Sequence, residues 1–195
     1  MIIFSNGGRS SLARLKQVLD EYSRASGQRI NSQKSCFLTH SEFPPRQAAA
    51  AGRILGFQRQ AFPVRYLGCP LYVGRRKKVY FTDMYNAVVA RILSWKNQLL
   101  SVGGRIVLVQ SVLASMPIHL LVAASPPQGV MGAVERLFAD FLWGPSDGGS
   151  KLHWIGWKDI CRPWEEGGVG LRTLKGVHDS LSVKLWWNFR QQQSL

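Results

Sequence analysis

Apolar residues recur at intervals of three and four in two neighbouring segments near the middle of the chain. This spacing matches the 3.6-residue turn of an α-helix, so each segment is predicted to be a helix. The second helix, over about 105–121, is apolar nearly all round and is predicted to be the buried partner, with a kink or early end at Pro117. Gly103-Gly104 is expected to join the two helices. The apolar stripe of the first helix consists of Phe81, Tyr85, Val88, Ile92, Trp95 and Leu99.

The same patterns predict further helices and a few short strands in the rest of the chain. A helix over 10–25 is expected to have Ser10 or Ser11 as its N-cap, and Gly27 is placed to end it. The predicted fold class is therefore mainly α (α+β). The other expected helices cover 10–25, 46–55, 126–143 and 179–189, and the expected strands cover 2–4, 35–39 and a hairpin over 64–73. The helix over 10–25 is predicted to bury Leu12, Leu15, Val18, Leu19, Tyr22 and Ala25. The helix over 179–189 is predicted to bury Leu181, Leu185 and Trp186.

The charge of the chain is strongly positive and unevenly distributed. The 195 residues include 25 Lys and Arg against 11 Asp and Glu, for a formal net charge of +14. Residues 1–80 contain 14 of these cations and only three of the acids, whereas residues 81–195 contain 11 and eight. Such a field attracts a polyanion, and nucleic acid is the usual one. The alternative is a solvated basic surface without a specific partner.

Cysteine usage and hydropathy bear on the environment of the protein. Cys36, Cys69 and Cys161 are far apart and odd in number, so neither a disulfide framework nor a CxxC metal site is predicted. The apolar runs are expected to be interrupted by charge or Gly before the roughly 18–20 residues that span a bilayer. Residues 1–5 are too short for a signal-peptide core. These patterns predict a soluble intracellular protein, nuclear or cytoplasmic, without a membrane partner.

Candidate catalytic groups are few in this sequence. Two-metal phosphoryl chemistry needs carboxylates from separate segments around cations about 4 Å apart. The adjacent acids are Asp20-Glu21, which point to different sides of a helix, and Glu165-Glu166, and both pairs are better explained as solvated surface groups. The histidines have no metal-ligand spacing, the glycine pairs are interpreted as turns, and a Ser-His-Asp constellation is left open without a Gly-x-Ser-x-Gly elbow. No catalytic residue, metal or cofactor is predicted.

Five of the seven tryptophans lie beyond a predicted linker at Asp147-Gly148-Gly149-Ser150. Aromatic side chains among cations can stack on single-stranded bases, each stack contributing roughly 1–3 kcal/mol. A Trp at helical spacing, such as Trp95 or Trp186, is more often part of a core, so a core position is the preferred interpretation. Trp164, beside Glu165, is the tryptophan expected to be exposed.

Several dispersed motifs, in a fixed order, resemble one known family. Residues 23–35 read SRASGQRINSQKS, and Tyr66-Leu67-Gly68, the LSWK of 93–96 and the LSVGGR of 100–105 follow. The series continues with Trp143-Gly144, Trp154, Trp157, Cys161, Pro163 and the GGVGLR of 167–172. The chain resembles the reverse transcriptase of non-LTR (LINE-type) retrotransposons, especially the plant copies that carry the name of ribonuclease H proteins. The resemblance runs over nearly the whole chain.

This resemblance implies a role for each matched segment. Residues 1–4 look like the strand that leaves the catalytic Tyr/Phe-Ala-Asp-Asp turn, so the chain is expected to begin after the two aspartates. Lys34 matches a lysine of the palm, which the resemblance implies to assist pyrophosphate departure in complete polymerases. Magnesium is implied only for a complete polymerase. Tyr66, Leu67 and Gly68 look like the primer-grip hairpin. The helices over 77–121 look like the thumb, which lies along the template-primer duplex.

The predicted architecture is therefore a helical thumb-like core with a small β remnant of a polymerase palm. Residues 1–74 would be the palm remnant with its hairpin, 75–145 the thumb-like domain and 146–195 a Trp-rich connecting region. The predicted function is a truncated reverse-transcriptase-like fragment without catalytic aspartates, hence not an enzyme as it stands. It would keep non-specific affinity for RNA, DNA or an RNA–DNA hybrid through Lys34, Arg65, Arg75, Arg76, Lys77, Lys78 and Lys96.

Two alternatives to nucleic-acid binding follow from the same residues. One is a domesticated protein-interaction module, in which the Trp-rich tail meets another protein. The other is a non-functional, pseudogene-like product that is unstable because a strand over 2–4 has lost its neighbours.

Overall fold

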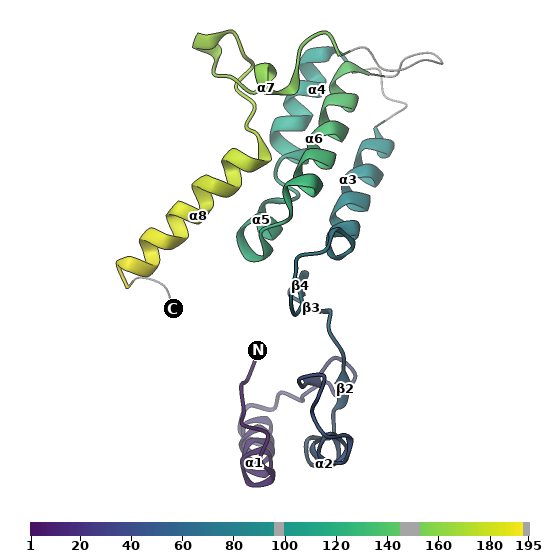
Figure 1. Cartoon of the computed structure of the whole chain (residues 1–195), viewed down its shortest axis with the longest axis vertical. Coiled ribbons are helices and arrows are strands. Elements are labelled where there is room, and N and C mark those ends of the chain that lie inside the picture. The colour runs from purple at the N-terminus through teal and green to yellow at the C-terminus, as the bar shows by residue number, and fades with distance from the viewer. Residues whose placement is uncertain (96–99, 145–152, 193–195) are drawn as a thin grey trace. The chain divides into compact units, whose positions relative to one another are not determined.

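A computed structural model describes residues 1–95, 100–144 and 153–192 of the chain. The chain divides into two compact units, Met1–Val64 and Arg65–Leu195, and each is described by itself. Helices account for most of the described residues and the strands are short, which confirms the predicted mainly α class (Figure 1). The division into three parts made from the sequence stays a prediction.

The first unit contains two helices and one pair of short strands. Helix α1 ends at Gly27, whose φ of 71° is left-handed, as predicted. Its N-cap is Gly8 and no side chain caps it, so the expected capping by Ser10 or Ser11 is wrong, because both serines lie inside the first turn. The elements are α1 (Arg9–Ser26), β1 (Cys36–Leu38), α2 (Pro45–Leu55) and β2 (Gln58–Gln60), with β1 and β2 parallel.

One strand prediction in this unit is wrong and one is confirmed. Residues 2–4 form no strand, and the Phe4 side chain is 93% exposed. The strand predicted over 35–39 is present as β1, and its partner is β2, which was not predicted because Gln58-Arg59-Gln60 has no apolar side chain. The small core contains Leu12, Ala51 and Leu55. Half of the predicted face of α1 is uncovered, since Val18, Tyr22 and Ala25 are exposed.

The second unit is built around one long helix, α6 (Gln128–Trp143). It packs against α3 (Thr82–Ser94), α4 (Val102–Leu108) and α8 (Leu174–Arg190), and Figure 1 shows α6 between α3 and α4. Val130, Val134, Phe138, Phe141 and Leu142 of this helix are buried in the core, and Leu137 is half-buried. The other elements are β3 (Val64–Tyr66), β4 (Cys69–Leu71), η1 (Lys78–Phe81), η2 (Val109–Leu113), α5 (Ile118–Ala124), α7 (Trp157–Ile160) and η3 (Trp164–Glu166). The buried core side chains are those of Phe81, Met84, Val88, Val109, Leu113, Leu120, Leu121, Val130, Met131, Val134, Phe138, Phe141, Leu142, Ile160, Leu171 and Leu174.

The predicted helix over 105–121 is three segments rather than one. Helix α4 begins at Val102, so Gly103-Gly104 lies in its first turn and is not a joint; the Ser101 hydroxyl accepts a hydrogen bond from the Gly104 amide at 3.2 Å. A π-helical turn, η2, follows α4, and the expected break at Pro117 is confirmed, since α5 begins at the next residue. Burial all round is wrong, because neighbours cover only one side and Val107 is 59% exposed.

The helical stretch Val102–Ala124 is long and apolar enough to cross a membrane, judged by length and composition alone. The expectation that charge or Gly would interrupt every such run is therefore wrong for this stretch, where Arg105 stands near the start. A core helix of a soluble protein passes the same test. Val109, Leu113, Leu120 and Leu121 of this stretch lie in the core of the second unit.

The Trp-rich tail is part of the second unit and contains a tight glycine turn. An added Cβ at Gly168 would lie 1.9 Å from the carbonyl oxygen of Arg162, so only glycine fits there. Helix α8 begins at Leu174, five residues before its predicted start, because Thr173 caps it by accepting a hydrogen bond from the Gly176 amide. Leu185 and Trp186 are exposed, which contradicts their predicted core positions. The prediction that Trp164 is exposed is confirmed.

Candidate nucleic-acid interface

The predicted primer-grip residues form the turn of a tight hairpin. Two residues, Leu67 and Gly68, connect β3 to β4, with φ values of 50° and 80°. Positive φ at both positions is typical of the two-residue hairpin turn and favours glycine at the second. The Leu67 side chain is 80% exposed at the tip, while Tyr66 is half-buried. The hairpin predicted over 64–73 is therefore confirmed.

One histidine fixes this hairpin to helix α5. The Nε2 atom of His119 lies 3.1 Å from the Leu67 carbonyl oxygen and 3.2 Å from the Cys69 Sγ atom. Since a carbonyl oxygen only accepts, Nε2 carries the proton in this contact. An added Cβ at Gly68 would lie 3.3 Å from the His119 ring, so the turn approaches the ring closely. Burial raises the pKa of the Cys69 thiol, which stays protonated at neutral pH.

The basic run follows the hairpin as a short exposed loop closed by two tyrosines. Tyr72 and Tyr80 stack with ring centroids 4.9 Å apart and an interplanar angle of 22°. Residues 73–79 therefore start and end at one place, and the four consecutive cations lie on the loop between them. This stack was not predictable from the sequence, because the two tyrosines are eight positions apart and belong to different elements.

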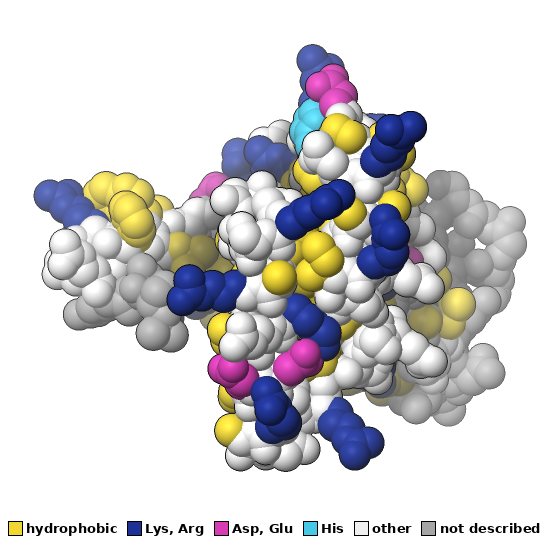
Figure 2. Space-filling model, turned by 90° about the horizontal axis from the view of Figure 1, so that it is seen from below, with side chains coloured by type: hydrophobic (Ala, Val, Ile, Leu, Met, Phe, Trp, Pro, Cys, Tyr) yellow, Lys and Arg dark blue, Asp and Glu magenta, His cyan; other side chains and the backbone are white. Residues whose placement is uncertain are grey.

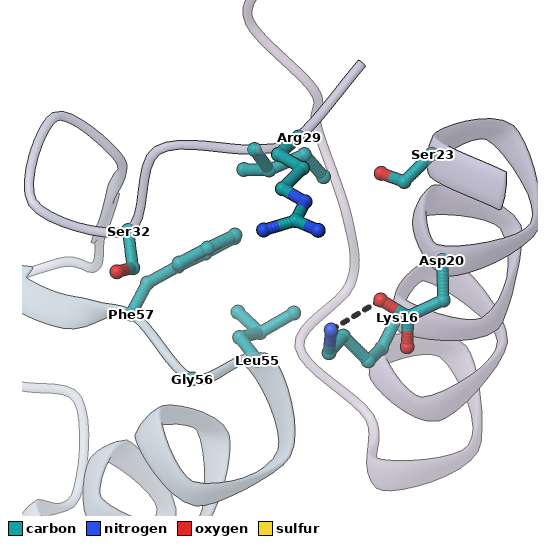
Figure 3. A pocket seen from close by; sticks show the side chains of 9 residues that line it. Lys16, Asp20, Ser23, Arg29, Ser32, Leu55, Gly56 and Phe57 are labelled. Atoms are coloured by element: carbon teal, nitrogen blue, oxygen red, sulfur yellow. Dashed lines mark hydrogen bonds and ion pairs between the residues drawn. The ribbon is translucent and has the colours of Figure 1, made fainter. Parts of the chain in front are cut away.

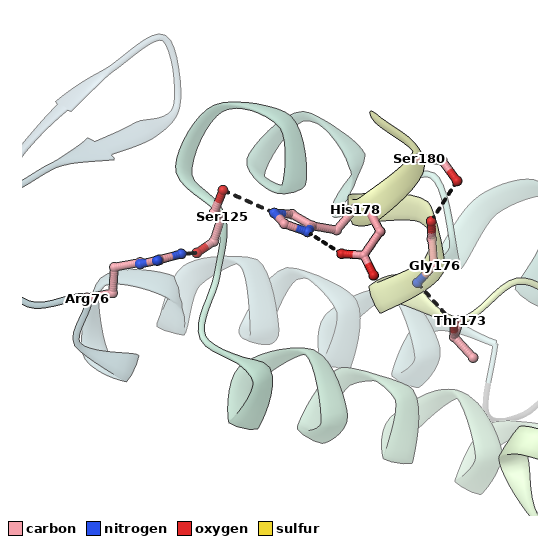
Figure 4. Close-up of polar contacts among 7 residues, drawn as sticks. Arg76, Ser125, Thr173, Gly176, His178 and Ser180 are labelled. Atoms are coloured by element: carbon pink, nitrogen blue, oxygen red, sulfur yellow. Dashed lines mark hydrogen bonds and ion pairs between the residues drawn. The ribbon is translucent and has the colours of Figure 1, made fainter. Parts of the chain in front are cut away.

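Arg76 ties the loop to the rest of the second unit. Its Nη1 donates to the Ser125 carbonyl oxygen at 2.9 Å, and Ser125 follows the last residue of α5 (Figure 4). The Ser125 hydroxyl lies 3.1 Å from Nε2 of His178 on α8, and Nδ1 of His178 lies 3.2 Å from an Asp179 carboxylate oxygen. Loop, α5 and α8 are thus joined by one polar chain. Arg76 is structurally engaged, unlike its neighbours.

The remaining predicted cations differ in how free they are. Arg65 forms an ion pair with Asp83 in the first turn of α3, so its charge is compensated. Arg75 and Lys77 are exposed and form no ion pair with the described residues. The aliphatic part of the Lys78 side chain lies against α6. A Cβ added at Gly129 of that helix would lie 3.2 Å from the Lys78 Cε atom.

Two predicted cations are not part of this loop. Lys34 belongs to the first unit, where it is exposed and its amide donates to the Asn31 side chain at 3.1 Å. Lys96 lies outside the described residues. The structure therefore gathers Arg75, Arg76, Lys77 and Lys78, with Arg65 one hairpin away.

Acidic side chains are scarce around the loop. No Asp or Glu occurs from residue 65 to residue 82 of the second unit, a segment that contains five Lys and Arg. This composition favours a positive potential around the loop. On the face drawn in Figure 2, Lys and Arg side chains likewise outnumber acidic ones.

The first unit holds an open pocket of about 330 Å³ beside the segment that contains Lys34 (Figure 3). Arg29 points between Phe57 and α1, and Lys16 of α1 is paired with Asp20. Lys34 does not line this pocket. Among the described residues, no group of three or more His, Cys, Asp or Glu side chains is placed to hold a metal ion.

A half-buried carboxyl group links the tail to α6. Glu135 Oε1 accepts a hydrogen bond from the Leu174 amide at 2.6 Å, which places a carboxylate at the N-terminus of α8. Burial raises the pKa of Glu135, and the Leu174 hydrogen bond offsets part of that rise. Burial and the nearby Glu135 charge raise the pKa of Cys161 to about 12, so this thiol is unreactive at neutral pH. These groups are structural in character.

Comparison with known proteins finds similarity to a plant protein and to a frog transposon protein. The chain is 32% identical over 125 residues, 64% of its length, to an Arabidopsis thaliana protein named "Putative ribonuclease H protein". It is 27% identical over 173 residues, 86% of its length, to the "Transposon TX1 uncharacterized 149 kDa protein" of Xenopus laevis. The chain spans 20% of the plant protein and 12% of the frog protein. No family model and no solved structure matches it.

These similarities agree with the resemblance inferred from the motifs at a coarse level. One relative carries the plant ribonuclease H name and the other carries a transposon name. The chain is thus related in sequence to a transposon protein and to a protein named for ribonuclease H.

Proposed function

We propose that this chain is a retrotransposon-derived, reverse-transcriptase-like fragment that binds nucleic acid without sequence specificity. The relatives support the origin, and the exposed basic loop supports the binding. Binding would rest on Arg75, Lys77 and Lys78, with Arg65 and Arg76 holding the hairpin and loop in position. Exposed, uncompensated cations contact phosphates and carry no base-specific information.

The observation that carries this proposal is the construction of the loop. Its ends are joined by the Tyr72–Tyr80 stack, and Arg76 fixes its middle to the end of α5. Arg75 and Lys77 on either side of Arg76 are left exposed, within a segment that has no acid. A preorganised set of cations loses less conformational entropy on meeting a phosphate backbone than the same cations on a free chain.

We further propose that the chain does not catalyse DNA synthesis by itself. The adjacent acid pairs of the sequence are engaged locally or exposed. In the first pair Asp20 pairs with Lys16 and Glu21 accepts from Gln17 at 2.8 Å, and in the second pair Glu165 and Glu166 lie on the exposed turn η3. Primer extension with Mg²⁺ on an RNA template tests this directly, and template-dependent extension by the purified chain would overturn it.

The binding proposal is tested by a salt titration of affinity for an RNA–DNA hybrid. In Arg75→Ala/Lys77→Ala/Lys78→Ala, the slope of log affinity against log salt should become shallower by about 2–3, as expected for three lost phosphate contacts. Arg65 and Arg76 are left unchanged because both have intramolecular partners. The matched control is Arg136→Ala/Lys158→Ala/Lys175→Ala, which removes one Arg and two Lys from exposed helix positions of the same unit.

The control variant distinguishes binding at the basic loop from attraction by the net charge of the whole chain. If binding belongs to the loop, the control keeps most of the wild-type slope although it loses the same charge. Equal losses in the two variants would mean that the net charge alone attracts nucleic acid. A wild-type affinity that does not change with salt would overturn the proposal.

A further inference from the structure

The last two turns of α8 expose a group of large aromatic side chains. Trp186, Trp187 and Phe189 are 56%, 54% and 74% exposed, and Val183 beside them is 65% exposed. We call the three aromatic residues the terminal aromatic face. Large apolar side chains exposed together often mark an interaction surface, so this group is unusual beside a formed core.

The helix that carries the terminal aromatic face is fixed at its other end. Leu174 is buried, Thr173 caps the helix, Glu135 accepts from the Leu174 amide, and His178 contacts Ser125. Figure 1 shows the C-terminal half of α8 extending away from α5 and α6. The rings are therefore presented on a rigid element and not on a loose tail.

The charge beside the rings is positive. Residues 180–195 contain Lys184 and Arg190 and no acid, and the preceding acid, Asp179, contacts His178. The guanidinium carbon of Arg190 lies 5.5 Å from the centroid of the Trp186 ring. A cation held over an aromatic ring next to further exposed rings combines a phosphate contact with a stacking surface.

The same arginine argues against an apolar partner. Val183, Trp186, Trp187 and Arg190 have the spacing by which a helix enters a hydrophobic groove. Arg190 occupies the fourth position of that series, and an apolar groove would have to desolvate its charge. A phosphate backbone neutralises this charge instead.

We propose that the terminal aromatic face binds single-stranded nucleic acid, with bases stacked on Trp186, Trp187 and Phe189 and the backbone against Lys184 and Arg190. This surface is separate from the basic loop and would take a different ligand, an unpaired strand in place of a duplex. The proposal goes beyond the hairpin-loop function and does not depend on it.

The test compares variants of the whole chain for affinity to a single-stranded oligouridine. Trp186→Ala/Trp187→Ala should weaken binding at least tenfold, since each lost base stack weakens binding several-fold or more. Trp186→Phe/Trp187→Phe should recover most of the affinity because the rings remain. The matched control is Val183→Ala/Leu185→Ala, which removes exposed apolar side chains of the same helix without removing a ring, and it should bind like the wild type.

Other occupants of the terminal aromatic face give different results. Equal weakening by the alanine control, or Trp-dependent binding to anionic lipid vesicles in place of oligouridine, would overturn the proposal in favour of apolar burial. Trp-dependent self-association in sedimentation would do the same in favour of a second copy. If the double alanine variant loses its cooperative melt, Arg190→Glu replaces it and should weaken oligouridine binding at least tenfold.

The two proposals fail separately. The loop variant Arg75→Ala/Lys77→Ala/Lys78→Ala is measured on the hybrid duplex, and the tryptophan variants are measured on the single strand. Loss of hybrid binding without a change on oligouridine, or the reverse, identifies which surface is at work.

Discussion

The two compact units of the chain differ sharply in how well their helices are covered. In the first unit, the buried cluster among the described residues is Leu12, Ala51 and Leu55, and α1 leaves Val18 and Tyr22 exposed. In the second unit, α6 is surrounded by α3, α4 and α8, and Val134 and Phe138 are almost completely buried. Amphipathic helices of similar length therefore have very different amounts of packing.

This difference shows that an apolar stripe is necessary for a helix to be buried but does not ensure that another element covers it. Most helical stability in proteins comes from packing an apolar face and not from propensity. Helix α1 has the stripe but few side chains to bury it against, so the first unit should contribute little stability. The second unit should hold most of the free energy of unfolding, and its seven tryptophans make its unfolding visible by fluorescence.

The largest expected effect is a core truncation in the second unit. Phe138→Ala should lower the free energy of unfolding by about 3–5 kcal/mol, because Phe138 is 1% exposed and contacts Trp157. Urea unfolding followed by Trp fluorescence measures this. Leu55→Ala is the control in the first unit and should leave the fluorescence transition in place, since the two clusters share no residue. A shift of similar size would mean that the units unfold together.

A smaller effect is expected from the glycine turn of the tail. Gly168→Ala should destabilise the second unit by about 1–3 kcal/mol or more, because the new Cβ would meet the Arg162 carbonyl oxygen. Gly132→Ala on α6 is the matched control. Nothing lies within 4 Å of its added Cβ, so it should stabilise the helix by about 0.5–1 kcal/mol. If both variants behave alike in urea, the tail is not part of this cooperative unit.

The smallest effect concerns the pH dependence of that same unit. Burial raises the folded-state pKa of Glu135, so the folded state binds more protons just above pH 4.5 and stability falls as pH rises through that window. Glu135→Gln keeps an oxygen acceptor for the Leu174 amide and should remove this fall in stability. Because one proton is involved, the slope of the unfolding free energy against pH stays under about 1.4 kcal/mol per pH unit. Urea midpoints between pH 4 and 7 measure it, with Glu165→Gln as the control for one lost charge. An unchanged slope would contradict the burial of Glu135.

Several features of the candidate interface were predictable from local sequence. The hairpin at Tyr66-Leu67-Gly68 was predicted, because two residues between short strands with Gly at the second have few other conformations. The four cations of 75–78 were visible as a run. Their separation into the engaged Arg76 and the exposed Arg75 and Lys77 was not predictable, since the partner of Arg76 is Ser125, far along the chain.

Two of the failed predictions have a common cause. The strand over 2–4 and the core position of Trp186 were both inferred from apolar character alone. An apolar run becomes a strand only when a partner strand takes its backbone hydrogen bonds, and a helix face becomes core only when another element covers it. Neither partner is present among the described residues for Phe4 or Trp186, which are exposed.

The sequence by itself determined where most helices lie, where α1 ends at Gly27 and how positive the chain is. These depend on residues within a few positions of each other, through the helical period, the left-handed preference of glycine and the sum of charges. The tertiary structure decided which faces are covered, that His119 holds the hairpin, that Glu135 caps α8, and that the terminal aromatic face is left open. Those outcomes depend on contacts between segments some 40–50 residues apart, and no local pattern encodes such contacts.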